Sequence, residues 1–432
     1  MEKLLDRARQ LDQEDRLGGF RDQFFTPRQD DGSAQHYFCG HSLGLQASSV
    51  EPVVQQELLA WRELAVRGHF EGDRPWMDCN NRLCSALAEI VGASPSELVV
   101  MNTLSVNLHL MMVSFFQPRG RRRKILIEKH AFPSDRYAVE SQLRFHGLEP
   151  AENLVELEPS SGEHLLEESA IETYLEDHGE DIALVLWPGV QYISGQAFDL
   201  ERIATAAHQA GAKIGFDLAH FIGNLPLSLH ASGCDFAAWC HYKYLNAGPG
   251  AIAGCFVHER HHQAGDLPRL NGWWGNDRGS RFRMEQAFTP SAGAAAWQLS
   301  TPPILSMAPL QASLALFQEA GMEHLRNKSR ALTAYLQEGI ENHLDGVIEI
   351  LTPADPERRG CQLSMRVRSG RERGRHLFLY LEEHGVLTDW REPDVIRVAP
   401  VPLYNRFADC AALLQTISDW AGLTGTPSRR SA

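Results

Sequence analysis

Three apolar, strand-like runs of the sequence end in residues that could do chemistry. KIGFDLAH ends in Asp217 and His220, FAAWCHYK ends in Tyr242 and Lys243, and LVVMNT leads into a helical pattern that begins near Ser105. In an open parallel sheet, ligands bind just beyond the carboxyl ends of the strands. We therefore expect these side chains to surround one site.

Taken singly, each of these residues has an ordinary explanation. An Asp after a strand often bonds neighbouring backbone N–H groups in a turn, a Lys before glycines is commonly solvated, and a Ser or Thr before an apolar helix is usually a cap. The combination is more informative, because Asp217 and Lys243 end two successive strands and a helix N-terminus can hold an anion beside them. Together they indicate a site for a charged cofactor.

Pyridoxal 5'-phosphate (PLP) needs the same three groups. Its aldehyde forms a Schiff base with an amine, its ring nitrogen needs a nearby anion, and its phosphate needs backbone N–H donors. Lys243 suits the first role because a lysine amine can lose its proton, whereas an arginine guanidinium keeps its proton at working pH. The pattern predicts a PLP-dependent enzyme that uses Lys243 and Asp217.

The hydrophobic pattern predicts the elements that hold these residues. Over residues 96–260, helical patterns alternate with six apolar runs: LVVMNT, KILIEKH, IALVLWPGV, KIGFDLAH, FAAWCHYK and GCFVHER. This alternation is typical of an α/β fold with a mainly parallel sheet covered by helices, and strands buried on both faces read as nearly all apolar. One connecting helix is bounded by Asp199 and Gly211, and another by Pro133 and Gly147.

Prolines at 302–309 mark the expected end of this large domain, because the pattern beyond them changes to a smaller α+β unit. We expect an N-terminal helical arm at 1–65 that packs with the small domain. The large PLP-binding domain, with a seven-stranded type of sheet, is expected at 66–305 and the small domain at 306–425. Residues 426–432 are expected to be a disordered tail.

Composition excludes several function classes. The formal net charge is −14, and the basic run RRRK at 121–124 is short, so nucleic acid is not expected as a partner. The charged N-terminus does not resemble a secretory signal, and the longest apolar stretch is too short to cross a bilayer. Eight cysteines without a CxxC pair suit a reducing cytoplasm. We expect a cytoplasmic protein without a membrane partner.

Two other kinds of catalytic site are not expected. The cluster HERHH at 258–262 has no acidic or Cys partner at ligand spacing in the sequence, so it is interpreted as a solvated loop and no metal is expected. The sequence also has no GxSxG motif, which disfavours a serine hydrolase.

Over nearly its whole length, the sequence resembles the kynureninase family, PLP-dependent hydrolases of the aspartate aminotransferase superfamily (fold type I). The segments that carry the resemblance are YFCGHSLGL (37–45), GHFEGDRPW (68–76), NTLSVNLHLMM (102–112), FPSD (132–135), FDLAHFIGN (216–224), CHYKYLNAGPG (240–250), NGWWG (271–275), STPPIL (300–305) and RVAPVPLYN (397–405). FDLAH or GPG alone is weak. FPSD, NGWWG, PPIL and RVAPVPLYN in this order are specific.

The resemblance implies a role in cofactor binding for ten residues. They are Leu104, Ser105, Phe132, Asp135, Asp217, His220, Tyr242, Lys243, Trp273 and Thr301. Lys243 would hold the cofactor covalently and move protons, while Asp217 would face the ring nitrogen. His220 would orient that carboxylate, although an ordinary buried histidine remains its alternative. Phe132 would stack on the ring and Asp135 would lie near it.

The remaining cofactor contacts would be made to the phosphate. Leu104 and Ser105 would supply backbone N–H groups, and Tyr242 a phenol. Trp273 and Thr301 would reach the phosphate side from a neighbouring subunit, so the resemblance implies a homodimer with its active site at the subunit interface. Pro188 stands where some relatives carry a serine, which removes one hydroxyl contact.

The implied reaction is hydrolysis of the Cβ–Cγ bond of L-kynurenine to anthranilate and L-alanine, a step of tryptophan catabolism and of the kynurenine pathway toward NAD biosynthesis. Arg397 would bind the substrate α-carboxylate, with a solvated strand-end charge as its alternative. His69 and Thr301 would lie near the substrate's aromatic ring. Thr301 replaces the Asn of animal relatives, which favours kynurenine over 3-hydroxykynurenine. Tyr242 is a candidate acid, but the sequence assigns neither the general acid nor the base.

Two alternatives stay open at this point. One is another PLP enzyme of the same fold, a cysteine desulfurase or an aminotransferase, although a desulfurase needs a mobile Cys and these cysteines lie mostly in apolar segments. The other is a non-catalytic interaction protein that kept the fold. The presence of both Lys243 and Asp217 disfavours that reading.

Overall fold

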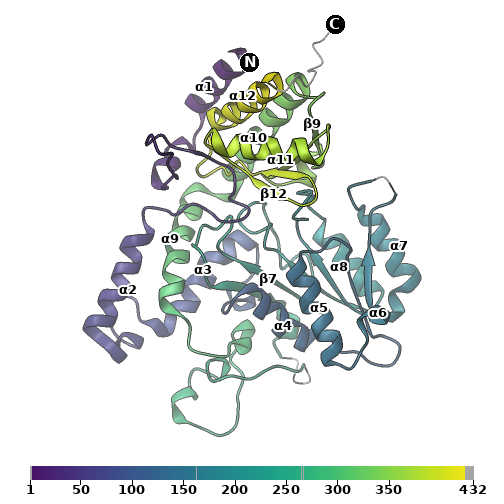
Figure 1. Ribbon diagram of the computed structural model, residues 1–432. Coiled ribbons are helices and arrows are strands. Elements are labelled where there is room, and N and C mark those ends of the chain that lie inside the picture. Colours follow the sequence, from purple (N-terminus) through teal and green to yellow (C-terminus); the bar gives the residue numbers. More distant parts are fainter. Residues whose placement is uncertain (1, 162, 264, 266, 424–432) are drawn as a thin grey trace.

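A computed structural model describes residues 2–161, 163–263, 265 and 267–423. It shows a large α/β unit beneath a smaller α+β unit, with the N-terminal helix lying against the smaller one (Figure 1). Within the described residues, no helix is long and apolar enough to cross a membrane.

A seven-stranded sheet forms the centre of the large unit. Its strands are β2 (Leu98–Val100), β3 (Lys124–Glu128), β4 (Leu154–Leu157), β5 (Ile182–Pro188), β6 (Lys213–Asp217), β7 (Phe236–Cys240) and β8 (Ala253–Val257). The order is β2-β8-β7-β6-β5-β3-β4, and β8 runs antiparallel to both of its neighbours while β7, β6, β5, β3 and β4 are parallel. The predicted α/β fold with a mainly parallel sheet is therefore confirmed. The sequence pattern missed β4, a half-buried edge strand without a strong apolar run.

Helices cover both faces of this sheet (Figure 1). The helices of the large unit are α2 (Val50–Leu64), α3 (Cys79–Val91), α4 (Leu104–Phe115), α5 (Pro133–Phe145), α6 (Pro150–Asn153), α7 (Glu168–His178), α8 (Leu200–Gln209) and α9 (Ile304–Ala320). Of these, α2 packs against α9 and not against the sheet. The predicted start of α8 is confirmed, because the Asp199 side chain accepts the Arg202 N–H. Gly211, just beyond the helix, has a φ of +77°, which favours glycine.

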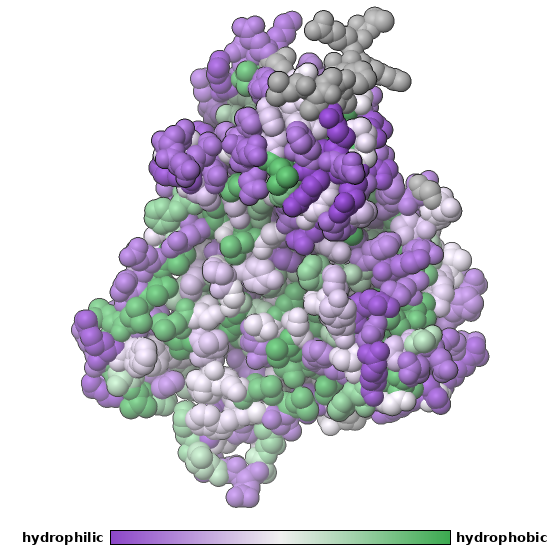
Figure 2. All heavy atoms as spheres, in the orientation of Figure 1, coloured by the Kyte–Doolittle hydropathy of each residue, from purple (hydrophilic) through white to green (hydrophobic). Residues whose placement is uncertain are grey.

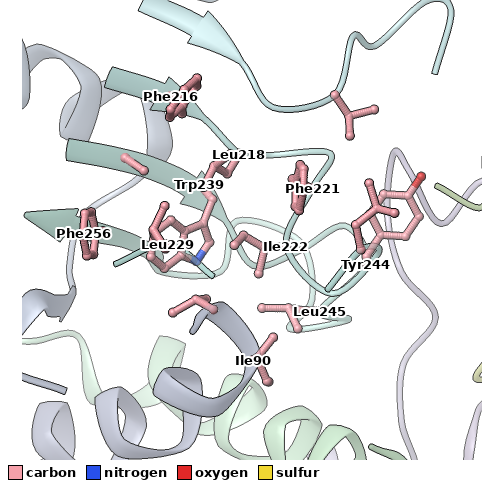
Figure 3. Packing of buried hydrophobic residues seen from close by; sticks show 14 of the residues in the cluster. Ile90, Phe216, Leu218, Phe221, Ile222, Leu229, Trp239, Tyr244, Leu245 and Phe256 are labelled. Atoms are coloured by element: carbon pink, nitrogen blue, oxygen red, sulfur yellow. The ribbon is translucent and has the colours of Figure 1, made fainter. Parts of the chain in front are cut away.

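Apolar packing anchors the two loops that follow β6 and β7. Figure 3 shows Phe221 and Ile222 from the first loop and Tyr244 and Leu245 from the second lying in one cluster, above Ile90 of α3. All five side chains are buried. Because Asp217 and Lys243 begin these loops, the core itself fixes their positions.

The smaller unit has a four-stranded antiparallel sheet in the order β12-β13-β10-β9. Its strands are β9 (Ile348–Ile350), β10 (Leu363–Val367), β12 (Asp389–Arg391) and β13 (Val395–Val398), and its helices are α10 (Met322–His343), α11 (Arg371–Glu383) and α12 (Phe407–Leu423). A short pair of parallel strands, β1 (His36–Tyr37) and β11 (Val386–Leu387), ties the N-terminal segment to this unit. Helix α1 (Glu2–Glu14) lies against it, since Tyr335 donates to the Leu4 carbonyl and Asp12 accepts the Phe407 N–H.

The expected domain limits stay predictions, and two features bear on them. The limit between 305 and 306 falls at the start of α9, whose buried side chains, such as Leu310 and Phe317, belong to the core of the large unit. Beyond α9, the first buried residue of the small core is Leu332 of α10. The expected tail at 426–432 lies outside the described residues.

Candidate functional site

The carboxyl ends of β3, β5, β6 and β7 surround a cavity. Eight of the predicted cofactor residues line it: Leu104, Ser105, Phe132, Asp135, Asp217, His220, Tyr242 and Lys243. Pro188, the end of β5, also lines the cavity. The structure therefore brings together residues from four strand ends and two helix N-termini, at the edge of the sheet where ligands bind in such folds.

A tight turn holds Lys243 directly after β7. The Asn246 N–H donates to the Lys243 carbonyl at 3.0 Å, and Asn246 adopts a φ of +51°, which asparagine tolerates. The Lys243 Nζ lies 5.8 Å from the centre of the Phe132 ring and 5.9 Å from that of Tyr242. Among the described residues, no carboxylate lies within ion-pair distance of this amine, which is thus available for covalent chemistry.

Two carboxyl groups share a hydrogen bond on the floor of the cavity. Asp217 is 8% exposed, and its Oδ1 accepts the Ala219 N–H at 2.7 Å. Burial and the adjacent charge and hydrogen bond of Asp217 raise the pKa of Asp135 well above its usual value. Asp135 therefore keeps its proton and shares it with the Asp217 carboxyl group. Asp217 is the acidic residue that is expected to face a pyridine nitrogen.

Two buried histidines lie beside this pair. The ring centres of His41 and His220 are 6.4 Å apart. Burial is the largest cause that lowers the pKa of both rings well below the usual value. The positive charges of Arg397, Arg391 and Lys243 lower it further. His220 Nδ1 and both ring nitrogens of His41 have no hydrogen-bond partner among the described residues. The orienting role expected for His220 stays a prediction, because the hydrogen bonds to Asp217 come from Ala219 and Asp135.

The two neutral histidines make the stability of the cofactor-free protein depend on pH. Above pH 6.5 both rings are neutral in the folded and the unfolded chain. As the pH falls below 6.5, the unfolded chain takes up protons that the folded chain refuses, so stability falls by up to about 1.4 kcal/mol per pH unit for each ring. The buried carboxyl groups of Asp135 and Glu128, whose pKa values are raised, act in the opposite direction over the same range. Urea unfolding at pH 6.5 and 5.5 measures the net change, to which the two histidines contribute this loss. His220→Gln should reduce it, and an unchanged loss would contradict the assignment.

The N-terminus of α4 forms the opposite wall and is suited to an anion. The first N–H groups of a helix have no partner within the helix, and the side chain of Thr103, which precedes Leu104, does not cap them. Behind the turn, Asn107 donates to the Met101 carbonyl and accepts from Asn102, whose φ is +50°. This arrangement points the N–H groups of Leu104 and Ser105 toward a phosphate.

Arg397 of β13 lies close to this site but is engaged by other groups. It is 1% exposed, with Nη1 donating to the Tyr192 carbonyl at 2.8 Å and Nη2 paired with Asp389 at 2.8 Å. Asp389 also accepts from Ser42 and pairs with Arg391. The alternative of a solvated strand-end charge is therefore wrong, because this guanidinium is buried. Its expected contact with a substrate carboxylate stays a prediction.

The negative charge of Asp389 offsets the free-energy cost of burying the Arg397 guanidinium. Removing one member of a buried ion pair leaves the other charge unpaired and typically costs about 3 kcal/mol or more. We expect Asp389→Ala to lower the free energy of unfolding in urea by about this amount. Glu357→Ala, which breaks the exposed pair with Arg330, should cost less than about 1 kcal/mol. Equal losses in the two variants would contradict the assignment.

Comparison with known proteins identifies the family. Residues 325–417 match the model of the kynureninase C-terminal domain. The kynureninase of Stenotrophomonas maltophilia is 56% identical over 425 residues, which cover 98% of this chain and 100% of that protein. The kynureninase of Xanthomonas campestris pv. campestris (strain B100) is 56% identical over 96% of this chain and 97% of that protein. The chain belongs to the kynureninase family.

Solved structures of other enzymes share the fold of this kynureninase family member. A C-DES variant with glycine covalently linked to its PLP cofactor superimposes with a TM-score of 0.77 at 18% identity, over 92% of this chain and 99% of that one. The cysteine desulfurase CsdA of Escherichia coli gives 0.75 at 17% identity, over 94% and 98% of the two chains. At these identities the likeness shows the fold alone. PLP is the cofactor of kynureninases, and the cavity offers the lysine, the anion and the helix N-terminus that it requires.

Besides Arg397, three residues expected from the kynureninase pattern do not line this cavity. Trp273 is 48% exposed, and Thr301 is exposed as well. His69 lies in a separate apolar hollow with Trp76 and with residues 303–306, just beyond Thr301. The cavity of a single chain is thus lined by none of the three. The contribution of Trp273 and Thr301 from a neighbouring subunit stays a prediction.

The HERHH cluster differs from its expected state as a solvated loop. The fold brings it acidic partners from distant segments, since His261 pairs with Asp235 at 2.7 Å and His258 lies 3.8 Å from Glu97. Glu97, His258 and His230 are close enough to hold a metal ion. Both Glu97 oxygens, however, already accept backbone N–H groups, and so does His258 Nδ1. These hydrogen bonds explain why the acidic and histidine side chains lie together. Spacing along the chain could not reveal the partners, which come from other elements.

Sequence reasoning missed several polar residues around the cavity. Glu128, Ser134 and Tyr192 line it, and Asp389 holds Arg397 behind it. Glu128 could have been found, because it ends an apolar strand as Asp217 does. Asp389 lies on a short strand of the small unit, and its contact with Arg397 is set by tertiary pairing alone.

Proposed function

We propose that the protein uses PLP on Lys243 to hydrolyse the Cβ–Cγ bond of L-kynurenine, giving anthranilate and L-alanine. The observation that carries the proposal is 56% identity to curated kynureninases over nearly the whole chain. The convergence of Lys243, Asp217 and the α4 N-terminus on one cavity supports it independently.

PLP, when bound, supplies an electron sink for the negative charge that develops on substrate carbon atoms. Asp217 would hold a negative charge at the ring nitrogen, and the hydrogen bond from Asp135 keeps that carboxylate in place. Phe132, which begins the turn into α5, would cover one face of the ring. Leu104 and Ser105 would bind the phosphate through their N–H groups.

Proton movements then fall to residues around the same cavity. Lys243, once its amine is displaced by the substrate amine, would be free to take the proton from the substrate Cα. Burial raises the pKa of Tyr242 above its ordinary value, so its phenol stays protonated and would serve as the acid at Cβ. Water adds to the γ-ketone, and its oxygen leaves in the carboxylate of anthranilate. Arg397 would bind the α-carboxylate through its Nε, which has no hydrogen-bond partner among the described residues.

A homodimer would complete the site. Large apolar side chains are exposed along α2 and on the loop of residues 270–300: Leu58, Leu59, Trp61, Leu270, Trp273, Phe282 and Met284. Figure 2 shows apolar residues gathered at the lower left and on the loop at the bottom of the molecule. A surface of this kind marks a protein interface. We propose that it packs against a second copy, which brings Trp273 and Thr301 to the phosphate.

Mixing two inactive variants tests whether Trp273 acts across the interface. In a mixed dimer of Lys243→Ala and Trp273→Ala chains, one site has both defects and the other has neither. Random exchange should therefore restore about a quarter of the wild-type sites, as follows from two-fold symmetry. Anthranilate release measured after unfolding and refolding the mixture checks this. A mixture no more active than its two components would mean that Trp273 acts within its own chain.

The substrate ring would lie between His69 and Thr301. The hollow that contains His69 is lined by apolar side chains of Trp61, Trp76 and Ile304, which suits an aromatic ring. Thr301 lacks the amide of the Asn in animal relatives. We therefore propose kynurenine as the better substrate and 3-hydroxykynurenine as the weaker one.

The alternatives lose support. A desulfurase needs a reactive thiol, yet seven of the eight free cysteines are buried, and burial raises the pKa of the half-buried Cys39 to about 12. A non-catalytic scaffold has no use for an amine held free in a cavity. The free cysteines also support our proposal of a cytoplasmic location.

A substrate panel tests the proposed function. Purified protein with PLP is incubated with L-kynurenine, 3-hydroxy-L-kynurenine or L-cysteine, and the products are quantified. We expect anthranilate and alanine in equal amounts, with a lower kcat/KM for the hydroxylated substrate and no sulfide from cysteine. Sulfide release, or amino-group transfer without anthranilate, would contradict the proposal.

A further inference from the structure

Glu128 forms part of the wall between the cofactor cavity and a second, outer groove. It is the last residue of β3 and is 5% exposed. Together with Tyr192 it lines both spaces. The outer groove is bounded by polar side chains that include His130, Glu158 and His164. A carboxyl group at this position can face the reaction on one side and solvent on the other.

The groups around Glu128 do not hold its side chain permanently in the charged form. Its Oε1 is buried without a hydrogen-bond partner among the described residues, and no cation pairs with it there. Burial and the nearby charge of Asp217 raise its pKa to about 8, although a hydrogen bond from Gln191 opposes the shift. Lys243, Asp135 and Asp217 line the cofactor cavity together with it, and Lys129, His130 and His164 line the outer groove. Its proton can thus be gained and lost near neutral pH.

The reaction under the proposed function needs a route for one proton. Water adds to an aryl ketone, the Cβ–Cγ bond breaks, Cβ gains a proton and the carbonyl carbon Cγ leaves as the carboxylate of anthranilate. One water is consumed, and the products are alanine, the anthranilate anion and one proton. No electrons are exchanged with another reactant. This proton must pass from the reacting atoms to solvent water.

We propose that Glu128 is the proton relay of this site, taking the proton released in the cofactor cavity and delivering it to water in the outer groove. The proposal rests on the proposed function, because hydrolysis of the ketone supplies the proton. It assigns to Glu128 a role separate from those of Lys243 and Asp217, which act on the cofactor and substrate directly. Several strands end at the cavity. Among the described residues, only β3 ends in a carboxyl residue, Glu128, that also lines the outer groove.

Glu128→Gln tests the relay, because the amide keeps the size of the side chain but cannot carry a proton. We expect kcat for L-kynurenine to fall by about tenfold to a hundredfold, with KM and PLP binding unchanged. The lost rate should return as imidazole buffer is raised at constant pH and ionic strength, whereas the wild-type rate should not respond. Glu158→Gln is the matched control, since Glu158 lines only the outer groove and pairs with the exposed Lys129. It should behave like wild type.

The outcomes separate the relay from the proposed function. Wild-type protein that leaves kynurenine intact would overturn the proposed function, and the relay with it. Active wild type together with an equally active Glu128→Gln, or with a slow variant that imidazole does not rescue, would overturn the relay alone. Glu128→Asp, which keeps a titratable group, should retain more activity than Glu128→Gln. If Glu128→Gln does not fold, Glu128→Ala takes its place in the imidazole titration, with the same expected rescue.

Discussion

Lys243→Ala is expected to lower kcat for L-kynurenine by about 10⁴-fold or more, because the variant loses both the covalent anchor of the cofactor and the base at the substrate Cα. No other residue that lines the cavity could replace Lys243 in these roles. Among the residues that line the cavity, Lys243 is the one with a primary amine. Anthranilate release under saturating kynurenine and PLP measures the loss. Borohydride reduction followed by peptide mass spectrometry should find the cofactor on the peptide with Lys243 in wild type and on no peptide of the variant.

Lys124→Ala is the matched control for this experiment. Lys124 begins β3, at the far end of the strand from the cavity, and pairs with Asp181. Its loss should leave kcat within about twofold, since partly exposed ion pairs contribute little. Lys243→Ala protein that still turns over at a tenth of the wild-type rate would show that another group does the chemistry.

Asp217→Ala is expected to lower kcat by about 10³-fold, or about 4 kcal/mol in activation free energy. The variant removes the anion that keeps the cofactor ring nitrogen protonated, and with it the electron sink. It also removes the hydrogen-bond partner of Asp135. The loss should appear in kcat more than in KM, because the anion matters most when negative charge develops in the transition state.

Asp217→Asn and Asp199→Asn refine this prediction. Asp217→Asn keeps the shape but not the charge, so it should remain nearly as slow as Asp217→Ala. Asp199→Asn keeps a capping side chain at the start of α8 and should leave kcat unchanged. An Asp217→Asn enzyme with wild-type kcat would show that the hydrogen bond, and not the charge, is what the site needs.

Much of the fold was predictable because local signals and burial agree. Strands buried on both faces have to be apolar throughout, so β3, β5, β6, β7 and β8 stood out from the sequence. Their carboxyl ends then indicated where Asp217 and Lys243 would meet. The half-buried edge strand β4 gave no such signal.

The rest of the site depends on tertiary contacts that have no sequence period. Arg397 is held by Asp389 from a neighbouring strand of the small sheet, with Ser42 from the N-terminal segment beside them. The acidic partners of the HERHH cluster come from distant segments in the same way. Residues such as Trp273 are exposed in one chain, so their expected role depends on a second copy.

Hydrolysis of L-kynurenine in water enriched in ¹⁸O tests the central claim most directly, because it follows the bond that is broken and the atom that is added. We predict one ¹⁸O atom in the carboxylate of anthranilate, with alanine formed in equal amount. Kynurenine that is left intact, or consumed without labelled anthranilate, would contradict the claim that this cavity carries out hydrolysis of the Cβ–Cγ bond.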